Sequence, residues 1–306
     1  MNAIETAGLC KQFKGKKMTR VDALKHLDLQ IAQGEVFGFL GPNGAGKSTT
    51  IKCLMGLISP TGGTGTILGE PIGSVASRMK VGFLPENPAF YDYLSAEEYL
   101  GFVGKAFNMA DALLSQRTDE ALKLLELWDA RKRPMRGYSK GMVQRVGLAQ
   151  TLIHDPDLYI LDEPMSGLDP IGRALVKEII LDLKKRGKSV FFSTHITDDV
   201  EKVCDRVGVI VKGKLEALDS VENIVRKGVE GYVVQTRLGV GRPDALSDFE
   251  TRRTNDTFAE YFVPVAAFNR FMSLAGQNSV EVTLVETKRK DLEAFFLEIV
   301  EKGEAR

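Results

Sequence analysis

Residues 41–49, with the sequence GPNGAGKST, constrain the fold of this chain more than any other feature. They fit the pattern G-x-x-x-x-G-K-[ST] of phosphate-binding loops without a mismatch. An apolar stretch at residues 36–40 precedes the loop and is typical of a buried strand, and residues 50–55 begin a helical pattern. Glycines in such a loop let backbone N–H groups point at an anion, and the N-terminus of the following helix adds partial positive charge. The pattern therefore predicts a strand–loop–helix phosphate site.

Every residue of this loop is a predicted binding residue. They are Gly41, Pro42, Asn43, Gly44, Ala45, Gly46, Lys47, Ser48 and Thr49. The Lys47 ammonium is expected to contact the outer phosphates of a nucleotide, and the Ser48 hydroxyl is expected to hold Mg²⁺. The alternative is a glycine turn that binds nothing, and the correct order of strand, loop and helix disfavours it.

Composition limits the class of protein. The 306 residues can form about two domains, and the 43% apolar content is ample for a core. The 41 basic and 41 acidic residues cancel, so nothing predicts a nucleic-acid partner or a polybasic membrane anchor. The three cysteines lie far apart without metal-site spacing, which favours a reduced cytoplasmic setting. No signal pattern or long apolar stretch occurs, so a role at a membrane would require another chain.

Short apolar runs alternate with amphipathic helical patterns, which indicates an α/β architecture. Strands are predicted at residues 36–40, 81–84, 158–161 and 190–192, with a hairpin over 207–218. Helices are predicted within 95–127, with a break near 109–111, and after Ser139. The pattern of predicted elements changes after Gly228. Strands are predicted there at 231–236, 258–263 and 280–285, and helices at 265–275 and 291–300. The pattern predicts a small α+β module after a boundary near residue 228.

Two carboxylates, Asp162 and Glu163, directly follow the apolar run 158–161. In an open α/β sheet the carboxyl end of a strand faces the ligand crevice. Asp162 is therefore placed to hold Mg²⁺, directly or through water. Glu163 can orient a water molecule for attack on the γ-phosphate. A strand that simply ends in acidic turn residues is the alternative, and the phosphate loop makes it less favoured.

The segment 138–142, with the sequence YSKGM, opens the helix that leads to the Asp162 strand. A serine followed by a glycine at a helix start offers a hydroxyl and free N–H groups to an anion. Taken alone, an ordinary capped helix is the simpler interpretation. The position of the segment, directly before the acidic strand, favours a functional role.

Over about residues 1–225 the chain resembles the ATP-binding subunit of an ABC transporter. The motifs occur in that family's order: the phosphate loop, a loop near residue 86, the signature 138–142, the acidic strand, residues 165–169 and His195. The resemblance implies a P-loop NTPase cassette, with a RecA-like core, an antiparallel β subdomain and a helical subdomain at about 88–155. The ATP-binding domain is then 1–228, and residues 229–306 resemble the accessory α+β domain of some exporter ATPases.

The resemblance also implies roles for individual residues. Glu163 and His195 match the catalytic base and the switch histidine that contacts the γ-phosphate of ATP. Asp169 ends a loop that crosses the subunit interface in the family. Ser139 and Gly141 match the residues with which a second subunit closes the site over ATP and Mg²⁺. Phe13 matches the aromatic that stacks on adenine, although a phenylalanine after a strand is more often part of a core.

Two positions depart from the family pattern. Glu86 stands where the family usually has glutamine, and an ionised glutamate can accept but not donate a hydrogen bond. Glu86 can still act as a ligand of Mg²⁺. The signature is Tyr-Ser-Lys-Gly-Met in place of Leu-Ser-Gly-Gly-Gln, with Ser139 and Gly141 kept and Lys140 adding a cation. Both variants resemble the bacterial exporter branch called ABC-2.

The resemblance implies an ATPase that powers a membrane exporter through ATP-driven dimerisation. The expected partners are a second cassette, identical or different, and a polytopic membrane permease. The expected location is cytoplasmic, peripheral on the inner face of the cell membrane. Four aromatic residues are candidates for the groove that receives the permease, or alternatively for packing within the helical subdomain. They are Phe90, Tyr91, Tyr93 and Tyr99.

Two other functions compete with this one. A soluble ABC ATPase that acts on nucleic acid or ribosomes usually carries two cassettes or a long coiled-coil insertion, and neither pattern occurs here. A binding module without turnover is disfavoured because the residues expected to carry hydrolysis are intact. These are Lys47, Asp162, Glu163 and His195.

Overall fold

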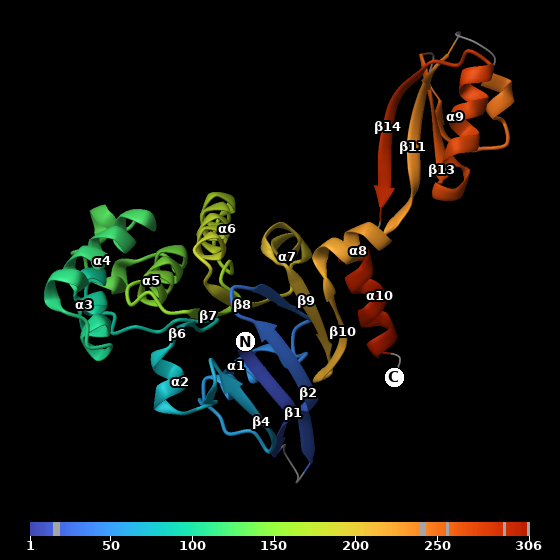
Figure 1. Ribbon diagram of the computed structural model, residues 1–306. Helices are drawn as coiled ribbons and strands as arrows, with labels where there is room; N and C mark the ends of the chain where they lie inside the picture. Colours follow the sequence, from blue (N-terminus) through green and yellow to red (C-terminus); the bar gives the residue numbers. More distant parts are fainter. Residues whose placement is uncertain (15–18, 239–242, 255–256, 290–291, 305–306) are drawn as a thin grey trace. The chain divides into compact units, whose positions relative to one another are not determined.

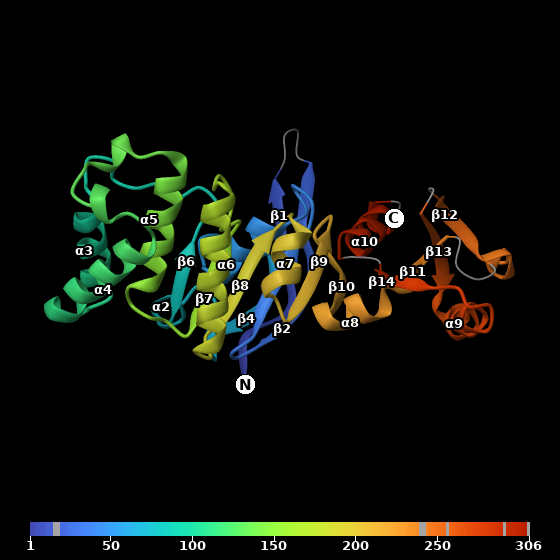
Figure 2. The ribbon, with the colours of Figure 1, turned by 90° about the horizontal axis from the view of Figure 1, so that it is seen from above.

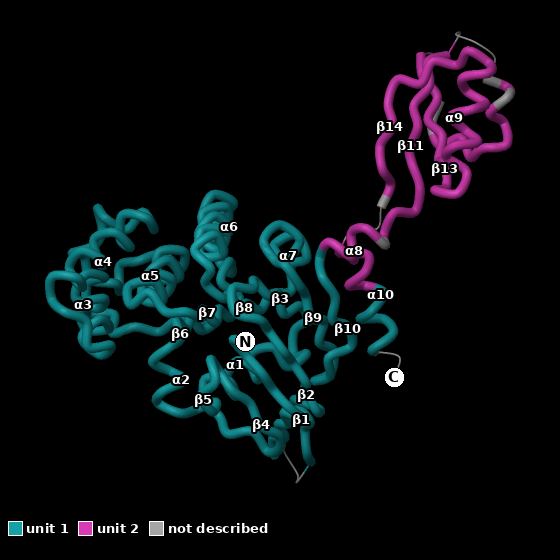
Figure 3. The backbone as a smooth tube through the Cα atoms, viewed as in Figure 1, with its two compact units in different colours: residues 1–221, 298–306 teal, residues 222–297 magenta. Residues whose placement is uncertain are grey.

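The structure is a computed structural model that describes residues 1–14, 19–238, 243–254, 257–289 and 292–304. The chain forms two compact units, shown in different colours in Figure 3. The first unit comprises Met1–Val221 and Glu298–Arg306, and the second comprises Glu222–Leu297. Each unit has its own hydrophobic core.

A six-stranded sheet with the order β10-β9-β3-β8-β7-β6 forms the centre of the first unit (Figure 1). Its strands are β3 (Val36–Leu40), β6 (Val81–Leu84), β7 (Leu158–Asp162), β8 (Ser189–Thr194), β9 (Arg206–Val211) and β10 (Lys214–Ser220). All neighbouring pairs are parallel except β9 and β10. Every residue of β3, β7 and β8 is buried. Continuous burial is expected for parallel strands covered on both faces, and it explains their unbroken apolar runs.

An antiparallel sheet with the order β2-β1-β4-β5 forms a second layer. Its strands are β1 (Asn2–Lys14), β2 (Arg20–Ala32), β4 (Gly62–Ile67) and β5 (Glu70–Pro71). Helix α1 (Lys47–Leu54) contacts both sheets, and its Ile51 and Leu54 share a core with Ile4 and Phe39. Helices α6 (Pro170–Lys185) and α7 (Thr197–Val203) cover the other face of the parallel sheet (Figure 2).

Helices fill the segment between β6 and β7. They are α3 (Ala96–Ala106), α4 (Asp111–Leu124) and α5 (Lys140–Leu152), with 3₁₀ turns at Trp128–Ala130 and Met135–Gly137. A short helix, α2 (Val75–Met79), lies before β6. Ser95 and Glu98 form a capping box at the start of α3, in which each side chain bonds the other's backbone N–H. The Ser139 hydroxyl caps α5, as the sequence pattern predicts.

The second unit contains an antiparallel sheet with the order β12-β13-β11-β14. Its strands are β11 (Val229–Arg237), β12 (Glu250–Thr254), β13 (Phe258–Pro264) and β14 (Val282–Arg289), and its helices include α8 (Val221–Lys227) and α9 (Phe268–Gln277). Phe271 of α9 packs with Val234 and Tyr261 of the sheet. The last helix, α10 (Leu292–Glu304), ends in the first unit, where a Cβ on Gly303 would lie 3.1 Å from a methyl group of Val211.

The predicted fold class is confirmed: the first unit is an α/β P-loop cassette with an antiparallel sheet and a helical part. The strands predicted at 36–40 and 81–84 have these bounds. The strand predicted from residue 280 begins at Val282 instead, because Ser279 takes a left-handed turn conformation directly after α9. The start of the helix predicted at Asp291 lies outside the described residues.

Candidate nucleotide-binding site

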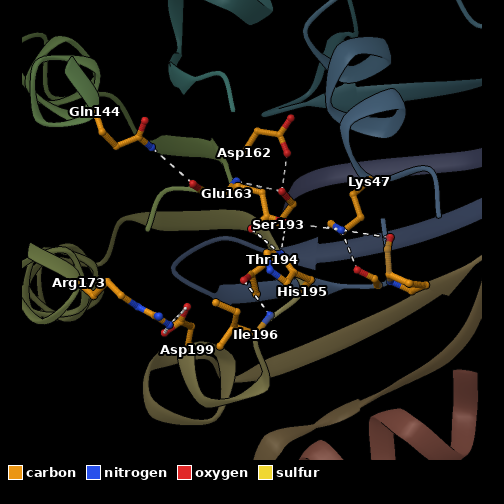
Figure 4. Close-up of polar contacts among 12 residues, drawn as sticks. Lys47, Gln144, Asp162, Glu163, Arg173, Ser193, Thr194, His195, Ile196 and Asp199 are labelled. Atoms are coloured by element: carbon orange, nitrogen blue, oxygen red, sulfur yellow. Dashed lines mark hydrogen bonds and ion pairs between the residues drawn. The ribbon is translucent and has the colours of Figure 1, made fainter. Parts of the chain in front are cut away.

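Three neighbouring strands of the parallel sheet bring the predicted motifs to one edge. Strand β8 lies between β3 and β7, and its register pairs Leu40 with Thr194 and Asp162 with Ser193. All three strands run in the same direction, so their carboxyl ends lie at the same edge of the sheet. The phosphate loop, Glu163 and His195 come directly after these ends and therefore lie close together (Figure 4). The phosphate loop lies more than a hundred residues before Glu163 and His195 in sequence, and the sheet brings them together, as is general for α/β sheets.

The phosphate loop needs glycine where its backbone enters helix α1. Gly46 precedes the helix with a φ of 113°, and a Cβ there would lie 2.7 Å from the carbonyl oxygen of Ala23. Only glycine adopts such a conformation without strain. The loop borders a cavity of about 310 Å³. The cavity is lined by Ala23, Pro42, Asn43, Gly44, Ala45, Gly46, Lys47, Ser48, Thr49, Glu86 and Glu163.

The ammonium group of Lys47 connects the loop to the acidic strand. Its Nζ donates to the carbonyl oxygens of Gly41 at 2.7 Å and Pro42 at 3.3 Å, and it lies 3.5 Å from a carboxylate oxygen of Glu163. Lys47 is buried, and a buried charge requires such partners. The structure therefore places one fixed positive charge between the phosphate loop and the predicted base.

Glu163 has a strained backbone at this edge. Its φ of 49° lies in the left-handed region, which costs a non-glycine residue on the order of 1–3 kcal/mol and is often found at functional sites. Its N–H lies 3.2 Å from the carbonyl oxygen and 3.1 Å from the hydroxyl of Ser193. Its carboxylate lies 3.0 Å from Nδ1 of His195, whose ring is half exposed. The predicted base and the predicted switch histidine are therefore direct partners.

Asp162 lies behind this pair and is linked to it through Ser193. The fully buried Ser193 hydroxyl donates to the Asp162 carboxylate and accepts from the Glu163 N–H. Asp162 itself is only 3% exposed. Ser193 is not among the residues that the sequence motifs predict, although a polar residue at the end of the apolar strand β8 is a visible signal.

The donor atoms at this edge fit Mg²⁺. The Ser48 hydroxyl and the Glu86 carboxylate belong to residues that line the cavity, and Asp162 adds a carboxylate behind it. Mg²⁺ prefers oxygen ligands and usually shares its coordination with substrate phosphates and water. Within the described parts of the chain, no cluster of three or more His, Cys, Asp or Glu side chains could hold a metal unaided. This arrangement suits an ion that is held jointly with a nucleotide.

The predicted residues Gly41, Asp162 and His195 do not line the cavity, but each is linked to lining residues, Gly41 through Lys47 and the other two through Glu163. Four other predicted residues lie outside the cavity lining without such a link. Phe13 lies within β1, not after a strand; its ring is 40% exposed, and Nζ of Lys11 lies 5.1 Å from the ring centre. Phe13 is thus not a core residue, and its ring is open to a stacking partner. Ser139 and Asp169 are exposed N-caps of α5 and α6, and Gly141 is half-buried beside Ser139. These three would need another molecule to complete a site around them.

The four predicted aromatic residues divide into two pairs. Phe90 packs against Tyr99 with ring centres 4.7 Å apart, and the Tyr99 hydroxyl bonds Gln150, so this pair belongs to the helical part. Tyr91 and Tyr93 are 56% and 66% exposed, with ring centres 5.9 Å apart. The exposed Phe102, which is not among the aromatic residues predicted from the sequence, lies edge-on to Tyr91. Together Tyr91, Tyr93 and Phe102 form an exposed aromatic patch.

A phosphate loop that faces an acidic pair across the edge of a parallel sheet defines a P-loop nucleoside triphosphatase. The family model described as "ABC transporter" matches residues 24–166. An uncharacterized ABC transporter ATP-binding protein of Synechocystis is 46% identical over 81% of this chain and 70% of the relative. The bacitracin transport ATP-binding protein BcrA of Bacillus licheniformis is 32% identical over 98% of both chains.

A dimeric bacterial ABC transporter cassette, MJ0796, has a similar structure, with a TM-score of 0.66 and 25% identity over 71% of this chain and 98% of the cassette. The chain belongs to the ATP-binding proteins of ABC transporters, and its activity is ATP hydrolysis. None of the helices in the described ranges combines the length and the apolar character needed to cross a membrane.

Proposed function

We propose that this chain powers a membrane exporter by hydrolysing ATP between two cassettes. The contact network of Lys47, Glu163 and His195 beside the phosphate loop carries this proposal. The exposed positions of Ser139 and Asp169, away from the cavity of their own chain, support a site completed by a second cassette. Similarity to BcrA, named for bacitracin transport, and to the dimeric MJ0796 cassette supports transport and pairing.

In this proposal the side chains of one cassette have separate roles in binding ATP and in its hydrolysis. The loop N–H groups and Lys47 bind the phosphates, and the Glu163 carboxylate accepts a proton from the attacking water. His195 holds that carboxylate in place through the 3.0 Å contact and reaches the γ-phosphate from its half-exposed position. Ser48, Asp162 and Glu86 would hold Mg²⁺, which neutralises phosphate charge when bound. Ser139 and Gly141 of the second cassette close the site.

Replacing Lys47 by alanine tests the phosphate loop. We expect Lys47→Ala to lower the affinity for ATP by about 10- to 100-fold, since a hydrogen bond between charged groups contributes about 1.5–3 kcal/mol. Titration calorimetry with ATP measures the change. Lys52→Ala, on the exposed side of the same helix, is the matched control and should bind ATP like wild type. Equal affinities for the two variants would contradict the proposed role of Lys47.

We further propose that the aromatic patch of Tyr91, Tyr93 and Phe102 contacts the permease, which would place the chain on the inner face of the membrane. Exposed aromatic groups of this kind are enriched at protein interfaces.

We expect the wild-type chain to co-purify from solubilised membranes with a protein that has several membrane spans. The double variant Tyr91→Ala, Tyr93→Ala should lose this partner. Leu113→Ala, at an exposed position on α4, should keep it. Recovery of ribosomes instead would favour the alternative function.

The domain assignment is also a proposal: residues 1–228 form the ATP-binding domain, with a helical subdomain at about 88–155, and 229–306 form an accessory domain. The separate core around Phe271 and Tyr261 supports an independently packed module. The end of α10 lies in the first unit, so this module is connected to the cassette at both of its ends. A role in supporting or regulating the dimer fits such a connection, and a passive stabilising role is the alternative.

A further inference from the structure

The signature segment of this chain touches the turn that carries its own catalytic glutamate. Gln144 lies on α5, is 3% exposed, and is not among the residues assigned to the site. Its side-chain amide donates to the carbonyl oxygen of Pro164 at 3.1 Å. It also donates to the carbonyl oxygen of Glu163 at 3.4 Å (Figure 4). The helix that begins with the signature serine is thus bonded to the backbone of the predicted base.

A second contact joins the same two segments. Gly167 has a φ of 73°, and a Cβ there would lie 2.8 Å from Cε of Lys140, so the signature lysine lies directly over this glycine. A Cβ on Gly141 would lie 3.7 Å from the carbonyl oxygen of Gly167. Residues 139–144 and 163–168 are therefore packed together at two places.

Gln144 is suited to hold the unusual backbone of Glu163. Ser193 fixes the amide side of Glu163, whereas Gln144 binds its carbonyl side together with the N–H of Ser166. A residue in the left-handed region keeps its conformation only where its surroundings determine it. The direction of the Glu163 carboxylate follows from that conformation, so a shift of Gln144 changes where the base points.

We propose that Gln144 is a positioning residue that couples the two ATP sites of a cassette dimer. The inference rests on the proposed function, in which Ser139 serves the nucleotide of the partner and Glu163 serves the nucleotide of its own chain. Gln144 lies about one and a half helical turns after Ser139 on the same helix. When Ser139 engages one nucleotide, α5 moves as a rigid element, and Gln144 carries that displacement to the base of the other site.

Steady-state hydrolysis by Gln144→Leu tests this coupling, because leucine has a similar size and no donor. We expect kcat to fall about 10-fold or more with little change in KM, because the base is misplaced while binding groups are intact. The Hill coefficient for ATP, which for two coupled sites approaches about 2, should fall to about 1. In the Glu163→Gln background, Gln144→Leu should still dimerise with ATP.

Two further variants separate positioning from packing. Thr151→Val removes a buried hydroxyl that donates to the Leu148 carbonyl of the same helix, and it should keep the wild-type Hill coefficient. In Gln144→Glu the ionised carboxylate cannot donate, whereas the protonated acid can. Burial raises the pKa of such a carboxyl group, so the activity of Gln144→Glu relative to wild type should recover between about pH 8 and about pH 6. A role of Gln144 in packing alone predicts no such recovery.

The outcomes distinguish this inference from the proposed function. If wild type neither binds ATP nor dimerises, the proposed function fails. If wild type does both and Gln144→Leu keeps its kcat and Hill coefficient, only the coupling by Gln144 fails. If Gln144→Leu does not fold, Gln144→Glu decides: no recovery at low pH overturns the inference, and recovery of kcat and cooperativity supports it.

Discussion

Glu163→Gln is expected to bind ATP like wild type and to lose about 10²–10⁴-fold in kcat, the usual contribution of a general base. Glutamine keeps the shape of the side chain but cannot accept a proton from water. The Glu163 side chain is only 10% exposed, and its partners are Lys47 and His195, so no other group easily takes its place. The variant should therefore accumulate ATP-bound dimers.

Phosphate release under saturating ATP measures this loss, and filter binding of labelled ATP measures the retained affinity. Glu178→Gln, at an exposed position on α6, is the matched control and should hydrolyse ATP like wild type. Near-normal turnover by Glu163→Gln would show that Glu163 is not the base. Loss of ATP binding would show instead that the carboxylate mainly holds Lys47 in place.

The buried strands of the sheet could be predicted from the sequence because parallel strands covered on both faces carry continuous apolar runs. Strands β3 and β7 are such runs, and their predicted ends agree with the structure within one residue. The long strands β1 and β2 were not predicted individually. Exposed polar residues interrupt their apolar positions, as at Lys25 and Asp28, and left-handed His26 breaks the alternation.

The motifs of the site could be predicted because each is a short local pattern, such as the phosphate loop at residues 41–49. The contacts between these motifs could not be predicted in the same way. Ser193 bonds Glu163 across 30 residues and Gln144 bonds Pro164 across 20, and each contact depends on which strands and helices become neighbours. The position of β8 between β3 and β7 is likewise a property of the folded sheet. The roles of the predicted site residues stay predictions, and the variants at Lys47, Glu163 and Ser139 test three of them.

Ser139→Arg is expected to abolish ATP-driven dimerisation and to lower hydrolysis by at least about 100-fold, while the monomer stays folded and still binds ATP. Ser139 is exposed at the start of α5, so a larger side chain meets solvent and not the core of its own chain. In a dimer the same side chain would fill the space of the partner's nucleotide. Light scattering with ATP in the Glu163→Gln background measures the dimer, and circular dichroism measures the fold.

The substitution also removes the N-cap of α5, which by itself costs about 0.5–2 kcal/mol of stability. Ser74→Arg separates this loss from the effect on the dimer, because Ser74 is likewise a capping serine but belongs to α2. We expect Ser74→Arg to dimerise like wild type. If Ser139→Arg also dimerises, Ser139 does not face a nucleotide held by another chain, and each cassette must then complete its own site.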